Sequence, residues 1–158
     1  TELARTGMGL FNDALDAITE QLRGTFGDEV DVKDHPGRFT DDELGKIILR
    51  KRKNIRVAVE DIPALTVEGT GVRAAQARFI AFVLCSDGRG EDRHRAALDL
   101  VEELAKTVIY NRWDRPEMFK ATTPDSITAE NLYSGEISSG KGLAWWSVSW
   151  TQDIKRTA

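Results

Sequence analysis

The segment at residues 72–85 restricts the fold of this chain more than any other part of its sequence. From Ala75 onward every second residue is apolar, and the last part of the segment is apolar at the intervening positions too. Successive side chains of a strand point to opposite faces, so the pattern predicts a long strand with one buried face. Because its second half is apolar on both faces, that half is expected to lie in the centre of a sheet. One face carries Ala75, Ala77, Phe79, Ala81, Val83 and Cys85, and the other carries Ile80, Phe82 and Leu84.

Other strands are predicted on both sides of this segment. Ile55, Val57 and Val59 alternate with Arg56 and Glu60, which is typical of a half-buried strand. Pro63 follows and has no backbone N–H to donate, so we expect it to end this strand or to place it near a sheet edge. After Pro116 we expect β segments at 118–121, 126–133 and 143–154. The glycine-rich residues 135–142 are expected to form the hairpin between the last two.

Three stretches have the spacing of amphipathic helices. The first extends from Phe11 to Phe26, and the second begins at Thr40, whose distance from Glu43 matches a capping box. The third and strongest covers residues 91–111. Together the elements predict one domain over residues 1–158 of the α+β class, in which helices pack on one face of a mainly antiparallel sheet.

Composition excludes several classes of function. The chain has 158 residues and a net charge of −4, which is unfavourable for a protein whose main ligand is nucleic acid, although DNA could pass it without being gripped. No apolar stretch approaches the length of a membrane helix, and Glu2 and Arg5 interrupt any signal-peptide core. Cys85 is the single cysteine, so an internal disulfide is impossible and a reducing cytoplasm is the expected environment.

Two glycine motifs resemble nucleotide-binding loops. Residues 69–74 match the dinucleotide fingerprint, and residues 135–142 have the spacing of a P-loop up to Lys141. Both motifs need a helix directly after the glycines, because its N-terminus meets the phosphates. Strand patterns follow both motifs instead, so we interpret each as a hairpin turn and expect no cofactor.

Metal binding and nucleophilic catalysis have little support. His35 and His94 are the only histidines, and neither has a second ligand at metal-binding spacing. His94 is expected to be solvated at a helix start. Cys85 lies in an apolar strand, where a thiol packs in the core and is not activated. We therefore predict a protein that is not an enzyme.

Aromatic and basic residues supply candidates for a subunit interface. Strand alternation places Trp146 and Trp150 together in the core and Trp145 on the opposite face, where it either contacts another subunit or covers the sheet within its own chain. The basic run at residues 50–53 is either a solvated helix end or a patch that meets the acidic surface of a neighbouring subunit. The interface candidates are Arg50, Lys51, Arg52, Lys53, Arg78 and Trp145.

Several segments together resemble a tail-protein family of Mu-like contractile phages and prophages, usually encoded just ahead of the tail sheath. They are RKNIRVAVED at 52–61, FIAFVLC at 79–85, EDRHRAALDL at 91–100, NLYSGE at 131–136 and GLAWWSVSWTQ at 142–152. The likeness covers roughly residues 8–155 in element order, and its layout is similar to tail terminators. The resemblance implies a hexameric ring that caps the tail tube and sheath and receives the head connector, with DNA passing through the lumen.

This resemblance implies a virion protein assembled in the host cytoplasm, with no membrane partner. Loops that could reach a neighbouring ring carry Asp87, Arg89, Glu136 and Lys141. A head–tail connector or tail-completion protein remains an alternative within the same class. The alternative from another class is a small enzyme or nucleotide-binding protein that uses one of the two glycine loops.

Overall fold

A computed structural model describes residues 9–69, 71–88, 90–133 and 142–156 of the chain. Within these ranges the helices are α2 (Leu10–Phe26), α3 (Asp41–Arg50) and α4 (Arg93–Val108), with short 3-10 turns at Gly27–Glu29 and Pro124–Ser126. The strands are β1 (Asp31–Asp34), β2 (Lys53–Glu68), β3 (Gly71–Cys85), β4 (Thr128–Asn131) and β5 (Ala144–Lys155). None of the described helices is both long and apolar enough to cross a membrane.

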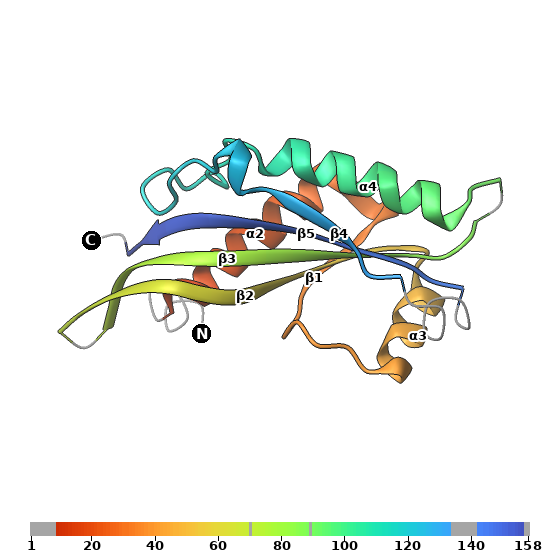
Figure 1. Ribbon diagram of the computed structural model, residues 1–158, viewed down its shortest axis with the longest axis horizontal. Helices are drawn as coiled ribbons and strands as arrows, with labels where there is room; N and C mark the ends of the chain where they lie inside the picture. Colours follow the sequence, from red (N-terminus) through yellow and green to blue (C-terminus); the bar gives the residue numbers. More distant parts are fainter. Residues whose placement is uncertain (1–8, 70, 89, 134–141, 157–158) are drawn as a thin grey trace.

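The strands form one five-stranded sheet in the order β1-β2-β3-β5-β4 (Figure 1). β1 pairs with β2 in parallel, and every other neighbouring pair is antiparallel. β3 lies in the middle, as its two apolar faces predicted. The predicted α+β fold with a mainly antiparallel sheet is therefore confirmed.

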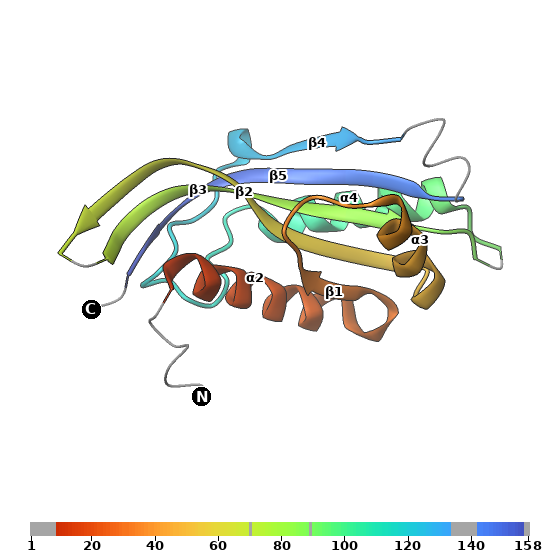
Figure 2. The ribbon, with the colours of Figure 1, turned by 90° about the horizontal axis from the view of Figure 1, so that it is seen from below.

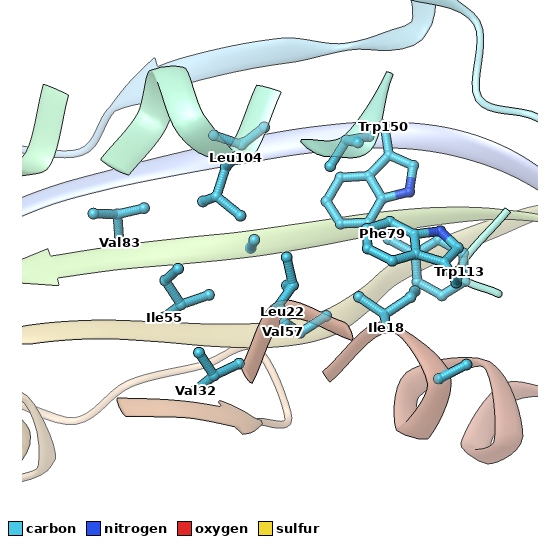
Figure 3. Packing of buried hydrophobic residues seen from close by; sticks show 14 of the residues in the cluster. Ile18, Leu22, Val32, Ile55, Val57, Phe79, Val83, Leu104, Trp113 and Trp150 are labelled. Carbon is cyan, nitrogen blue, oxygen red and sulfur yellow. The ribbon is translucent and has the colours of Figure 1, made fainter. Parts of the chain in front are cut away.

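The main core lies between the sheet and the two long helices, which cover the same face (Figure 2). The first apolar face of β3 enters this core over its whole length. Phe79, Trp113 and Trp150 form its aromatic centre, with the ring centroids of Trp150 lying 5.8 Å from those of the other two (Figure 3). Large aromatic side chains bury much apolar area each, so this cluster contributes strongly to stability.

The short helix α3 packs at one end of the opposite face. Its residue Leu44 belongs to a second apolar cluster that includes Phe82 and Leu84, which explains why β3 has a second apolar face. Thr40 caps the helix as its spacing predicted, because its hydroxyl accepts a hydrogen bond of 3.2 Å from the N–H of Glu43.

The strands differ from the expectations in two places, and the structure decides between the two alternatives for Pro63. β1 was not expected, because Val32 is the only apolar residue in it. Residues 118–121 form no strand; Phe119 only makes an isolated bridge to Ile154. Pro63 does not end β2, because register shifts between Asp61 and Ala64 accommodate the missing N–H and let the strand continue to Glu68. The expectation that Pro63 lies near an edge is confirmed, since β1 pairs only with residues 54–57.

Candidate functional site: the open sheet edges

The outer part of β2 is an open strand edge. Beyond Val57 no described strand pairs with its outer side, and residues 60–68 are exposed apart from the half-buried Ile62. With β3 it forms a hairpin arm that extends past the helices and curves (Figure 2). Leu65 and Val67 are 52% and 65% exposed on this arm. Unpaired backbone groups beside exposed apolar side chains are a template for pairing with another chain.

β4 forms the opposite edge of the sheet. It pairs with β5 along Thr128–Asn131, and all four of its side chains are exposed. No described strand pairs with its outer side. The chain thus presents two different open edges on opposite sides of one sheet. Two different surfaces that bind each other produce a head-to-tail interface, and such interfaces generate rings when the rotation closes.

Charge makes pairing of the β2 arm with its own copy unfavourable. The arm has Glu60 and Asp61 at one end and Glu68 at the other. In an antiparallel pair of two arms, acidic residues of one copy lie opposite acidic residues of the other, and like charges directly opposite are destabilising. Arg78 and Arg73 offset part of this charge within the chain, at 3.3 Å from Glu60 and 3.4 Å from Glu68. Asp61 has no such ion pair among the described residues.

The basic run is largely committed to contacts within the chain. Lys51 donates from its Nζ to the carbonyl of Asp28, and the cationic groups of Arg52 and Lys53 lie 3.8 and 3.3 Å from the same Glu91 carboxylate. Arg50, by contrast, is exposed at the end of α3. These contacts join the start of β2 to the turn before α4. A subunit contact through the run stays a prediction.

The turn before α4 is held by side chains as well as by backbone. Asp87 accepts hydrogen bonds of 2.9 Å from both the backbone N–H and the guanidinium of Arg93. Gly88 lies against the Arg52 guanidinium so closely that a Cβ atom would overlap it. A larger residue there would therefore require the Arg52 side chain to move. The other loop candidates, Arg89, Glu136 and Lys141, lie outside the described residues.

Trp145 packs inside its own chain. Its ring centroid lies 5.7 Å from that of Phe39 and 6.5 Å from that of Phe82, beneath the α3 end of the sheet. Its side chain remains half-buried. Of the two alternatives that its position offered, the structure favours a tryptophan that covers the sheet, and an interface role stays a prediction.

The glycine motifs are followed by strands. Gly71 and Ala74 lie in β3, paired with Glu68 and Thr66 of β2, and Gly69 turns the hairpin with a φ of 58° that favours glycine. Residues 135–141 of the second motif lie outside the described residues, and β5 begins shortly after Gly142. At the first motif no helix N-terminus is present to meet a phosphate.

The two histidines and the cysteine have the following surroundings. His35 stacks on Phe39 with centroids 4.0 Å apart, and its Nε2 lies 3.0 Å from a carboxylate oxygen of Glu43. His94 has a ring contact with Tyr133. Burial raises the pKa of the Cys85 thiol to about 12, so it is not activated. In the described part of the chain, no group of three His, Cys, Asp or Glu side chains could hold a metal ion.

The sequence did not indicate a cleft of about 590 Å³, which lies at the end of the sheet remote from α3. Its lining comes from β2, β3, β5 and the segment between α4 and β4. No sequence pattern brings together four segments so far apart in the chain. The only available signal was the group of cations at Arg112, Lys120 and Lys155, which sequence analysis left uninterpreted.

Comparison with known proteins was made by family model and by sequence. No protein-family model matches the chain, and no curated protein matches its sequence.

Proposed function

We propose that this chain is a structural subunit that assembles with copies of itself into a ring. The observation that carries the proposal is the pair of open edges, one on the projecting β2 arm and one on β4. Pairing of the arm of one subunit with the β4 edge of the next continues the sheet from subunit to subunit. Leu65 and Val67 supply apolar area to such a contact, since both side chains are more than half exposed.

Within this structural class we propose the role of a phage tail terminator. The support is the resemblance of the segments at 52–61, 79–85, 91–100, 131–136 and 142–152 to the tail-protein family of Mu-like phages. In that role six copies would cap the tail tube and sheath and present a surface to the head connector. The net charge of −4 suits a conduit, because an acidic lumen does not hold the DNA that passes through it.

The double substitution Leu65→Lys/Val67→Lys tests the assembly. It should shift the wild-type oligomer towards the monomer in sedimentation velocity at matched concentration, because added charge on an edge strand opposes strand pairing. Leu98→Lys is the matched control, since Leu98 is an exposed leucine on α4 and lies outside both edges. The proposal fails if the edge variant and the control sediment as the wild type does, with an oligomer present in all three.

The specific role is tested with purified tail tubes. A terminator should bind tube ends and stop further tube growth at a fixed length. A head–tail connector should instead bind filled heads and leave tube growth unchanged. Binding to neither would remove the tail assignment while leaving self-assembly to be judged by sedimentation.

A further inference from the structure

The cleft remote from α3 lies on the face of the sheet that the long helices leave uncovered. Strand register places Ala64, Gln76 and Asp153 side by side on this face, opposite the main core. Thr66, Ala74 and Lys155 form the next row along the strands. These floor residues are short or polar, whereas α3 covers large apolar residues at the other end of the same face. The cleft of about 590 Å³ has the size of sites that bind ligands or short peptide segments.

Cations gather around this floor. Arg112, Lys120 and Lys155 all line the cleft, and Asp153 is the only acidic residue that does so among those described. None of the three cations forms an ion pair within the described residues. Most of the other described lysines and arginines form an ion pair or donate a hydrogen bond to a carbonyl. The chain has a net charge of −4, but the lining of this cleft, with three unpaired cations and one carboxylate, has a net positive charge. Such a site attracts anionic groups.

The lining favours a peptide over a nucleic acid. Single-stranded nucleic acids are bound by exposed aromatic side chains on which bases stack. The aromatic side chain in this lining, Phe119, is only 1% exposed and cannot present a ring face. The small side chains of Ala64 and Ala74 allow a partner's backbone to come close to the sheet.

We propose that this cleft binds an extended acidic segment of a partner protein. The carboxylates of the segment pair with Arg112, Lys120 and Lys155, and its small side chains lie on the alanine and threonine floor. Ala64 and Thr66 belong to the β2 arm, but they line the cleft on the face of the sheet, whereas strand pairing uses backbone groups at its edge, so the cleft would remain available in a ring. It therefore gives the subunit a surface for a second protein and does not depend on self-assembly.

The test measures binding of a fluorescein-labelled peptide of alternating glutamate and alanine by fluorescence anisotropy. Wild-type protein should bind it saturably, and the binding should weaken as salt is added. Lys120→Glu/Lys155→Glu should lower the affinity about tenfold or more, since two attractive contacts become repulsive. Lys46→Glu/Arg95→Glu is the matched control, because it reverses two exposed cations on α3 and α4 and should leave the affinity within about twofold. Thermal unfolding of both variants verifies that they fold.

Three results would overturn the proposal. The first is no saturable binding of the acidic peptide to wild type at about 1 mM, the weak limit of a specific site. The second is equal binding by the wild type and the folded cleft variant. The third is tighter binding of a short oligothymidylate than of the peptide, which would reassign the cleft to nucleic acid. If the cleft variant instead loses self-association in sedimentation and the peptide does not bind, the cleft belongs to the contact between copies.

Discussion

Replacing Gln152 with leucine is expected to lower the free energy of unfolding by about 3–5 kcal/mol. The side chain is 2% exposed and forms hydrogen bonds with four groups at once. Its Oε1 accepts from the indole N–H groups of Trp113 and Trp150, at 2.9 and 3.2 Å. Its Nε2 donates to the carbonyls of Asn111 and Lys120, at 2.8 and 2.7 Å. Leucine fills a similar volume and leaves all four groups without this partner, so the cost is desolvation and not a cavity.

Urea unfolding followed by tryptophan fluorescence measures this loss. Gln76→Leu is the matched control, because Gln76 is a half-buried glutamine on the neighbouring strand and accepts or donates no side-chain hydrogen bond that the structure shows. The free energy of unfolding of the Gln76→Leu variant should lie within about 0.5 kcal/mol of that of the wild type. Gln152→Glu should also be strongly destabilised at neutral pH, because its carboxylate would face the two carbonyl oxygens. A Gln152→Leu variant as stable as the control would contradict the role of this side chain.

The second large effect is expected at the buried ion pair between β1 and β2. Arg56 is 5% exposed and its Nη2 lies 3.0 Å from the Asp31 carboxylate. Asp31→Asn leaves that guanidinium charge without its counter-ion and should cost about 2–3 kcal/mol. The cost stays below that of a fully broken buried pair, because the carbonyls of Asp31 and Ile55 still accept from Arg56.

The same pair predicts a dependence of stability on pH. Burial acts to raise the pKa of Asp31, but the hydrogen bond and charge of Arg56, with Lys33 and Arg50, lower it overall. A carboxylate with a lowered pKa stabilises the folded state above its unfolded pKa, and this contribution disappears as pH falls through the folded value. Wild type should therefore lose more stability than Asp31→Asn between neutral pH and about pH 3. Asp34→Asn, an exposed position on the same strand, should follow the wild-type curve, and equal curves for wild type and Asp31→Asn would contradict the argument.

The parts of the fold that were predicted correctly are those with a local apolar pattern. β3 was predicted from its two apolar faces, and α2 and α4 from their helical spacing, because burial dictates these side chains along a single element. β1 was missed because its pattern has one buried valine between charged residues and its pairing with β2 is parallel and distant in sequence. Of the two alternatives that Pro63 offered, the edge position is the correct one, because a bulge on an edge strand removes the cost of the missing N–H.

The open edge and the cleft were harder to predict, because both depend on contacts between segments that are distant in the sequence. Pro63 indicated that β2 lies near an edge, but nothing in the sequence indicated how far the strand continues beyond β1. The cleft and the Gln152 network depend on segments brought together by the tertiary fold, so no local pattern reports them. The basic run was visible in the sequence, yet its partners Asp28 and Glu91 lie far from it along the chain.

Cross-linking between the two edges tests the central claim most directly. Ala64→Cys places a thiol on the β2 arm and Thr128→Cys places one on β4, both at exposed positions, while the native thiol of Cys85 is buried with a raised pKa and reacts slowly. The two variants are mixed and treated with a flexible bismaleimide that tolerates a shift of register. Head-to-tail pairing predicts a covalent dimer in the mixture and little in either variant alone. A mixture that cross-links no more than the separate variants, or an Ala64→Cys variant that cross-links fully with itself, would contradict head-to-tail pairing of the β2 arm with β4.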